Sequence, residues 1–487
     1  MKILANLYLW QEGKFTNEPK CLLVEDGSIW EILPFPLPHL YEHISATDFN
    51  GAYAYPGFID THTHSFEGGL YSLGVDLSTA KSIEDILALL SEANSQKTKD
   101  EFIFAWQLDE TLLKEKRFPT LTELNTAVPD KALILRRIDG HSCSLNSFAR
   151  NLVTSLNTKE EILRGADNDC AVHFFHKRLP DEAILDAYQA AAKIGLQAGF
   201  TSLHTMIGDA DNSITHYELI RNNLDQFPLR FILYPQSFNL KSALDAGAKR
   251  IGGCILADGS IGSETAALSE PYLNTNSRGV LYQSDEFWQN LISEASKHQL
   301  QVAIHCIGDR AIKQINDVYK NIPETRDLRH ELIHCELTPN ELVADIVSSG
   351  AVPVMQPNFD LLWGGENGFY AKKLGKNRSQ IMNRFATFIS MGVTITGGSD
   401  WYITPLNAAL SIRAALNHHN PCERLTIAQA IDLYTKNAAW LNKEEMTYGQ
   451  IQKGYVADLS VYSNPIEDES AQLQFILSNG IIQYAAI

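Results

Sequence analysis

Two histidines separated by a single residue are the first candidates for chemistry in this chain. His62 and His64 end a short apolar run that is typical of a β-strand. Residues two apart on a strand share a face, so both imidazoles can converge on one metal ion. Three further residues of ligand type, His305, His334 and Asp400, each end a predicted strand. Five such residues at the ends of four separate strands predict one metal site.

The donor set indicates which ion and which reaction to expect. Imidazole and carboxylate together suit Zn²⁺ first, with Mn²⁺ or Fe²⁺ as alternatives. A catalytic cation lowers the pKa of a bound water to about 7, which makes that water a nucleophile near neutral pH. Asp400, a carboxylate among these ligands, is predicted to accept a proton from that water and to deliver it to a leaving group. A solvated strand end or ordinary packing is the alternative explanation for these residues.

Eight predicted strands alternate with helical patterns between the two ends of the chain. The strands are expected at residues 55–60, 199–204, 229–235, 252–257, 301–305, 331–334, 351–356 and 393–397, and clear helical patterns span 285–298 and 426–441. This alternation predicts an α/β fold built on a (β/α)₈ TIM-type barrel. Active sites of such barrels lie at the carboxyl ends of the strands, where the candidate ligands fall.

The remaining segments predict the domain organisation. Residues 1–54 and 446–487 contain short strand patterns, and neither end has enough strands to bury a core alone. Together they are predicted to form a small β-sandwich beside a barrel of residues 55–445. Residues 66–198 are too many for one crossover, so they are predicted to form an insertion between the first and second barrel strands. Within the insertion, strands are expected at 102–106 and 132–137 and helices at 82–92 and 180–197.

Composition limits the classes of partner. The 487 residues are 45% hydrophobic and 20% charged, as in ordinary globular proteins, and the net charge of −18 argues against nucleic acid or an anionic membrane as a partner. No apolar stretch approaches the roughly 20 residues that span a bilayer, and the N-terminal segment does not resemble a signal peptide. The seven cysteines are scattered, which is typical of free thiols in a reducing compartment. We therefore expect a cytoplasmic protein that acts on a small molecule.

Several motifs together resemble the amidohydrolase superfamily, and within it the YtcJ-like branch, the amidohydrolase-3 group. They are Pro56–His64, Leu135–His141, Ala257–Ser263, His305–Ala311, Gly398–Asp400 and the closing segment from Asn437 to Asp458. The resemblance covers nearly the whole chain. It implies metal-dependent hydrolysis, typically of amide or related C–N bonds. It also implies two ligands from the first strand, one each from the fifth and sixth, and an aspartate from the eighth, which here are His62, His64, His305, His334 and Asp400.

Three positions depart from the resemblance. Many superfamily members carry a carbamylated lysine on the fourth strand that bridges two metals, and Cys254 stands at that position. Glu264 replaces an arginine, and Phe359 occupies a position where a histidine is often found. A Cys254 thiolate would bridge two ions or shape the pocket around one, and the simplest alternative is a buried hydrophobic residue. One or two ions therefore remain open at this stage.

Two further histidines are candidates for catalysis. His204 ends the second predicted strand, and His141 lies in the insertion. Either side chain is predicted to donate a hydrogen bond to the substrate carbonyl and to stabilise a developing oxyanion. The alternative for each is a hydrogen-bonded histidine that holds a loop.

The sequence thus predicts a metal-dependent amidohydrolase that cleaves an amide-type, non-peptide C–N bond of a small molecule, with Asp400 as general base and acid. Hydrolysis of an ester or lactone, or deamination of a ring, would use the same residues. A binding or regulatory module with a decayed site is the remaining alternative. The oligomeric state stays open at this stage, and a homodimer is the commonest arrangement for such an enzyme.

Overall fold

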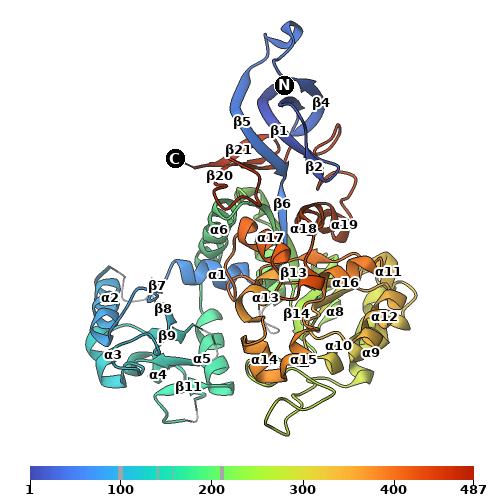
Figure 1. Ribbon diagram of the computed structural model, residues 1–487. Helices are drawn as coiled ribbons and strands as arrows, with labels where there is room; N and C mark the ends of the chain where they lie inside the picture. Colours follow the sequence, from blue (N-terminus) through green and yellow to red (C-terminus); the bar gives the residue numbers. More distant parts are fainter. Residues whose placement is uncertain (97–101, 139, 141, 157, 209–212, 487) are drawn as a thin grey trace. The chain divides into compact units, whose positions relative to one another are not determined.

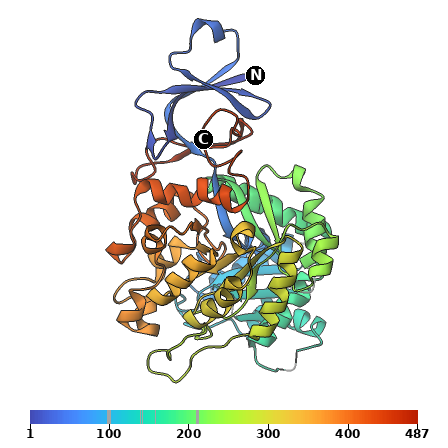
Figure 2. The ribbon, with the colours of Figure 1, turned by 90° about the vertical axis from the view of Figure 1, so that its right-hand side faces the viewer.

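A computed structural model describes residues 1–96, 102–138, 140, 142–156, 158–208 and 213–486 (Figures 1 and 2). The chain forms two compact units: Met1–His64 with Ala192–Ile487, and Ser65–Ala191. The second unit corresponds to the predicted insertion of 66–198, except that it ends at Ala191.

Strands from both ends of the chain share one sheet in the first unit. Its order is β21-β20-β19-β5-β1-β3-β4, with β2 paired to β1, and Figure 1 shows the blue N-terminal strands beside the red C-terminal ones. The strands are β1 (Lys2–Gln11), β2 (Lys14–Phe15), β3 (Lys20–Glu25), β4 (Ser28–Pro34), β5 (Ala46–Pro56), β19 (Leu459–Tyr462), β20 (Leu473–Ser478) and β21 (Ile481–Ala485). Their shared core includes Leu7, Val24, Phe49, Leu459 and Leu477. The two termini therefore depend on each other for burial, and the term sandwich for this sheet stays a prediction.

Eight parallel strands carry the rest of the first unit. One sheet contains β6 (Phe58–Thr63), β12 (Phe200–Ile207) and β13 (Arg230–Pro235). The other contains β14 (Arg250–Leu256), β15 (Gln301–Cys306), β16 (Glu331–His334), β17 (Val352–Met355) and β18 (Thr396–Gly397). Every hydrogen-bonded pair among them is parallel. Each of the eight predicted strands overlaps one of these, and the predicted α/β class is confirmed.

Helices follow these strands along the chain and surround them in Figure 2. They are α6 (Asp181–Gln197), α7 (Ser213–Arg221), α8 (Leu240–Asp245), α9 (Asp285–Lys297), α10 (Asp309–Lys320), α11 (Thr325–Leu328), α12 (Asn340–Ser349), α13 (Pro357–Trp363), α14 (Phe369–Leu374), α15 (Lys376–Ser379), α16 (Phe385–Ser390), α17 (Ala408–Leu416), α18 (Ile427–Tyr434) and α19 (Lys436–Leu441). The single helix predicted over 426–441 is wrong, because the backbone of Thr435 leaves the helical region and separates α18 from α19. Among the described helices, none is both long enough and apolar enough to cross a membrane.

The second unit has a five-stranded sheet of its own, in the order β11-β10-β9-β8-β7. The strands are β7 (Val75–Asp76), β8 (Ile103–Leu108), β9 (Leu133–Arg137), β10 (Ser142–Leu145) and β11 (Ile162–Arg164), and the helices are α1 (Ser65–Ser72), α2 (Ile83–Gln96), α3 (Leu121–Ala127), α4 (Ser147–Leu152) and α5 (Ala166–His176). The two strands predicted here are β8 and β9. The other three are short and carry little apolar alternation, so the sequence pattern did not reveal them.

Gly57 marks the point where the chain passes from the terminal sheet to the parallel strands. The sequence predicted one strand over 55–60, but β5 ends at Pro56 and β6 begins at Phe58. The predicted domain boundary at residue 54 therefore falls inside β5. A Cβ atom on Gly57 would lie 2.4 Å from Thr201 Oγ1 and 2.7 Å from Thr201 Cγ2. Only glycine fits this close approach, which ties the terminal sheet to the strand that carries His62 and His64.

We expect Gly57→Ala to lower the free energy of unfolding by about 1–3 kcal/mol, because the added methyl group overpacks a buried contact. Gly262→Ala is the matched control. Its Cβ would meet the Phe369 ring at 3.7 Å and Ser260 Oγ at 3.8 Å, both ordinary van der Waals contacts, so a change within about 0.5 kcal/mol is expected. Urea unfolding of both variants at equal metal content is the measurement, and equal midpoints would contradict the packing argument.

Candidate metal centre

Six side chains lie together at or near the carboxyl ends of the parallel strands. They are His62 and His64 from β6, Cys254 from β14, His305 from β15, His334 from β16, and Asp400, which follows β18. The donor atoms of His62, His64 and Cys254 all lie within 4.8 Å of one another. The same holds for His62, His334 and Asp400. His62 belongs to both groups and therefore joins them into one centre.

Measured separations show how the side chains face one another. Asp400 Oδ1 lies 3.2 Å from His62 Nε2 and 3.3 Å from His64 Nε2. Cys254 Sγ lies 3.9 Å from His305 Nδ1. The ring centroids of His305 and His334 are 4.5 Å apart, and those of His62 and His334 are 5.2 Å apart. The structure thus brings together all six residues that the sequence nominated as ligands.

Asp60 fixes the backbone on which two of these ligands stand. Its buried carboxylate accepts hydrogen bonds from the backbone N–H of His62 and of Ser399, each at 3.0 Å. Next to these contacts, the backbone N–H of Asp400 donates to the carbonyl of His62 at 2.9 Å. One carboxylate therefore couples β6 to the segment after β18 and sets the position of Asp400 against His62.

Two ligands adopt left-handed backbone conformations. φ is 68° at His334 and 56° at Asp400, a region that non-glycine residues occupy at a cost of about 1–3 kcal/mol unless surrounding contacts hold them. The contacts around Asp60 hold the Asp400 segment. Both residues come where a strand ends, so the left-handed turn redirects the side chain at the carboxyl end of the strand.

Neighbouring oxygen acceptors define which ring nitrogens are free to bind a metal. His334 Nδ1 lies 2.8 Å from Gln356 Oε1, and the Gln356 amide is itself oriented by a 3.3 Å bond to the carbonyl of Val354. His334 Nδ1 therefore carries the proton, which leaves Nε2 as a ligand. His305 Nε2 lies 3.2 Å from the carbonyl of Gly259. His305 consequently presents a lone pair at Nδ1, the nitrogen nearest to Cys254.

The charges of the acidic groups are set by these histidines. Burial opposes ionisation of the Asp400 carboxyl, but His62 and His64 outweigh it and hold its pKa well below the usual range. Burial also opposes a thiolate at Cys254, but His305, His334 and His64 outweigh it and hold the pKa of the thiol well below its ordinary value. Two anionic ligands thus exist at neutral pH.

The histidines respond in opposite directions. Burial favours a neutral ring at His305, but the contact with Cys254 dominates and raises the pKa of His305 to about 9. Burial, and then the charge on His305, lower the pKa of His334 to about 4. Without an ion, the negative ligands are balanced by protons on neighbouring imidazoles, and a divalent cation would displace those protons.

The centre fits a metal ion by an independent criterion. Both ring nitrogens of His62 and Asp400 Oδ1 are buried and make no hydrogen bond among the described residues, although His62 Nε2 and Asp400 Oδ1 lie only 3.2 Å apart. Each buried polar atom left in this state costs about 1–3 kcal/mol. A cation held by imidazole, carboxylate and thiolate would satisfy these atoms, and that donor set suits zinc and related divalent ions.

Aromatic side chains line one side of the centre. Phe359, in α13, stacks on His334 with ring centroids 5.6 Å apart and an interplanar angle of 11°. Trp363 follows one helical turn later, 4.6 Å from Phe359. Phe359, which stands where the resemblance leads one to expect a histidine, therefore places an apolar ring against the ligand His334.

Asp360, His418 and His419 form a second cluster that the sequence reasoning missed. Asp360 accepts from the backbone N–H of His419 at 2.8 Å and lies 3.2 Å from His418 Nε2. His418 Nδ1 accepts the backbone N–H of Asn420 at 3.0 Å, so in the neutral ring the proton resides on Nε2 and is available to Asp360. This tautomer favours a hydrogen-bonded clamp on α13 over a second metal site. The adjacent pair of histidines was the signal in the sequence.

Other polar residues near the strand ends have varied surroundings. His204 is fully buried on β12, and its Nδ1 lies 3.1 Å from the hydroxyl of Tyr234. Asp258 accepts from the backbone N–H groups of Ala267, Ile307 and Gly308 at 2.7–2.9 Å, so it holds the loop beside His305. His141 lies outside the described residues.

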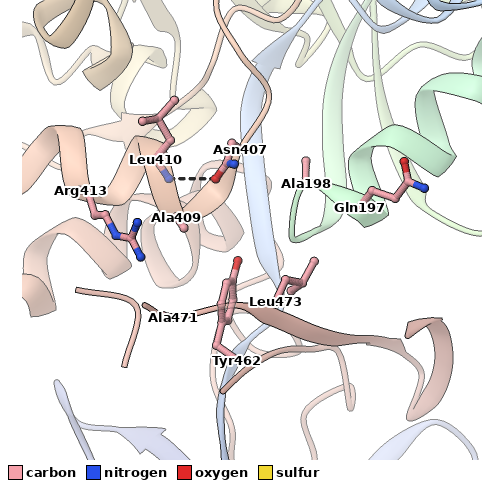
Figure 3. A pocket seen from close by; sticks show the side chains of 9 residues that line it. All are labelled: Gln197, Ala198, Asn407, Ala409, Leu410, Arg413, Tyr462, Ala471 and Leu473. Atoms are coloured by element: carbon pink, nitrogen blue, oxygen red, sulfur yellow. Dashed lines mark hydrogen bonds between the residues drawn. The ribbon is translucent and has the colours of Figure 1, made fainter. Parts of the chain in front are cut away.

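A separate pocket of about 270 Å³ lies between the end of α6, α17 and the terminal strands β19 and β20 (Figure 3). It is lined by Gln197, Ala198, Asn407, Ala409, Leu410, Arg413, Tyr462, Ala471 and Leu473. The Arg413 guanidinium is already engaged, because Nε donates to the carbonyl of Ile466 at 2.8 Å and Nη2 to that of Asp468 at 2.6 Å. The lining shares no residue with the metal centre.

Comparison with solved structures identifies a protein that shares this fold. The chain superimposes on an uncharacterized metal-dependent hydrolase from Pyrococcus furiosus with a TM-score of 0.81, at 22% sequence identity, over 96% of this chain and 100% of the other. This likeness establishes a shared fold.

Sequence comparison establishes the family. The chain belongs to the amidohydrolase family, whose model matches residues 46–474. It is 29% identical to YtcJ of Bacillus subtilis (strain 168), over 89% of each chain. It is also 22% identical to the N-substituted formamide deformylase of Arthrobacter pascens, over 90% of this chain and 89% of the other. The resemblance to the amidohydrolase-3 group is thereby confirmed.

We expect Cys254 to be alkylated readily by iodoacetamide at pH 7 in chelator-treated protein, and roughly tenfold more slowly after zinc is restored, because the thiolate is both the nucleophile and the ligand. Exposed Cys422 is the internal control, and its labelling is expected to be the same in both states. Peptide mapping by mass spectrometry reads both sites in one sample. Equal Cys254 labelling with and without zinc would remove it from the ligand set.

Proposed function

We propose that this protein is a metal-dependent hydrolase that cleaves an amide-type, non-peptide C–N bond of a small molecule. The observation that carries the proposal is the buried convergence of His62, His334 and Asp400, whose ligand atoms all lie within 4.8 Å of one another. Family membership supports hydrolysis. The relative that is an N-substituted formamide deformylase supports a C–N bond outside peptides.

The proposed cation would be held by the four histidines and Asp400, with Cys254 as a sixth donor. When bound, such an ion polarises a carbonyl oxygen and makes water a better nucleophile. Zinc is the proposed ion. Cys254 lies among the ligands, which supports a thiolate in the place of the carbamylated lysine of other members. Such a thiolate would bridge two ions or lie beside a single one.

Asp400 is the proposed proton carrier. His62 and His64 hold its carboxylate ionised, as the direction of its pKa indicates, so it can accept a proton from the attacking water. The water oxygen bonds to the carbonyl carbon, the C–N bond breaks, and Asp400 returns the proton to the departing nitrogen. Without that proton the nitrogen is a poor leaving group.

The larger architecture supports this assignment. We propose that the eight parallel strands form a (β/α)₈ barrel, since Thr63 and Trp401 form a parallel bridge between β6 and the segment after β18. Ligands at the carboxyl ends of the strands are where barrel enzymes place their sites. A cytoplasmic location and a homodimer stay predictions.

Ester or lactone hydrolysis and ring deamination are alternatives on the same residues. A panel of N-substituted formamides, other N-acyl amines, lactones and aminopyrimidines separates these bond types. A binding module with a decayed site would show no turnover on any of them and would bind no metal.

We expect Asp400→Asn to lower kcat/KM about 10²–10⁴-fold on the best amide of that panel, because the proton carrier is lost. Asp317→Asn, an exposed position on α10, is the control and should retain full activity. Metal content measured on the same samples separates loss of the proton carrier from loss of the ion. Unchanged hydrolysis in Asp400→Asn would refute the assignment.

A further inference from the structure

His204 lies on the face of β12 that looks into the core shared by the parallel strands. Residues two apart on a strand share a face, and Met206 packs in a core with Ile232, Tyr234 and Val354 from neighbouring strands. In the register of β12 with β6, Leu203 pairs with Asp60 and Thr205 with Thr63. His204 is therefore level with the segment of β6 that contains His62.

A chain of buried polar groups begins at this histidine. His204 Nδ1 lies 3.1 Å from the hydroxyl of Tyr234, whose ring stacks on the imidazole. The same hydroxyl lies 2.9 Å from Glu331 Oε1. All three side chains have 0% exposed surface. His204 Nε2 has no hydrogen-bonded partner among the described residues, so it is the free end of the chain.

The single proton of the Tyr234 hydroxyl makes the two ends of the chain interdependent. If Glu331 is ionised, it can only accept, so Tyr234 donates to it and His204 must donate from Nδ1. Nε2 is then bare. If Glu331 is protonated and donates to Tyr234, the hydroxyl can turn and donate to Nδ1, and the ring proton then resides on Nε2.

We propose that Tyr234 and Glu331 are positioning residues that set the tautomer of His204, so that a proton on Glu331 presents an N–H at His204 Nε2 and its removal presents a lone pair. This inference rests on the proposed function, since it assigns His204 a switchable contact with the amide substrate. The protonated form donates to the substrate carbonyl oxygen. The bare form can only accept.

The surroundings of Glu331 place this change within an accessible pH range. Tyr234 from β13 contacts the Glu331 carboxyl directly, and Arg250 from β14 acts on it through its charge. His204 from β12 is linked to it through Tyr234, and the hydroxyl of Tyr319 from α10 donates to the Glu331 backbone carbonyl. Burial raises the pKa of Glu331 to about 8 against the opposing charge of Arg250. Burial, followed by Arg250 and Arg230, holds the pKa of His204 well below its usual value, so the ring stays neutral while its tautomer changes.

The sign of the pH dependence follows from these directions. Below about pH 8 Glu331 is protonated and Nε2 of His204 bears the proton. Above that pH Glu331 is ionised and the proton moves to Nδ1. Hydrolysis that uses His204 as a donor is therefore expected to decline on the alkaline side.

The test is ¹⁵N NMR of the histidine rings in the zinc-loaded, full-length protein between pH 6.5 and about 9.5, the range that brackets the Glu331 transition. Protonated and bare ring nitrogens give well-separated signals, and the His204 signals are identified by their absence in His204→Gln. We expect Nε2 of His204 to change from the protonated to the bare type near pH 8. One unchanged tautomer across this range would overturn the proposal.

Two variants test the path of the coupling. Tyr234→Phe keeps the ring that stacks on His204 but removes the hydroxyl, and Glu331→Gln removes the titrating group. Both should give a His204 tautomer that no longer changes with pH, and both should flatten the alkaline limb of kcat/KM. A pH-dependent tautomer that persists in Tyr234→Phe would also overturn the proposal.

The NMR measurement needs no substrate, so its result is independent of the proposed reaction. A tautomer change without turnover on any amide would retain the coupling and refute the proposed function. Turnover of an amide with a fixed His204 tautomer would retain the proposed function and refute the coupling. If a variant fails to fold, the pH series on the unaltered protein still decides the question.

Discussion

The carboxylate of Asp60 is the contact on which the centre depends. It binds backbone N–H groups of His62 and Ser399, which are 337 positions apart in the chain (399 − 62). β18 is only two residues long, and the segment after it is paired to β6 by the bridge between Thr63 and Trp401, which is little strand pairing to fix a ligand. Burial raises the pKa of Asp60 to about 7, while the N–H donors oppose this and favour the carboxylate. The backbone N–H groups of His62 and Ser399 are thus held in place by the Asp60 carboxylate, and in return they stabilise its negative charge.

The centre itself is a balance between burial and opposite charge. An isolated carboxylate or thiolate buried at this depth would be protonated instead. Asp400 and Cys254 lie among imidazoles that favour their ionised forms, and the unsatisfied nitrogens of His62 mark what the protein side chains leave incomplete. The left-handed conformations of His334 and Asp400 add local strain to the same site. Buried charges, unsatisfied nitrogens and backbone strain do not improve packing. Their presence together indicates that these residues are arranged to bind a cation.

Sequence predicted the parts of this structure that arise from local patterns. Apolar runs located the eight parallel strands, and ligand-type residues at their ends located His62, His305 and Asp400. What the sequence could not supply depends on tertiary contacts. The division between β5 and β6 at Gly57 follows from the approach of Thr201. The clamp on α13 joins Asp360 to His418 and His419, which lie 58 and 59 positions further along the chain (418 − 360 and 419 − 360). Neither has a spacing that local patterns reveal.

The buried chain of His204, Tyr234 and Glu331 also depends on tertiary contacts that local sequence patterns do not reveal. Its chemistry gives a reason for a carboxyl group in the core. The parallel pairing of β12 with β13 brings His204 near Tyr234, and Glu331 reaches the same hydroxyl from β16, a strand of the other sheet. An apolar residue in place of Glu331 would pack well, but the Tyr234 hydroxyl would then donate to His204 Nδ1 at every pH and fix a single tautomer. A carboxyl whose pKa lies near neutrality costs little to bury, because it is uncharged below that pH. The core can therefore hold a proton-sensing group within reach of the ligand layer without placing a permanent charge among its apolar side chains.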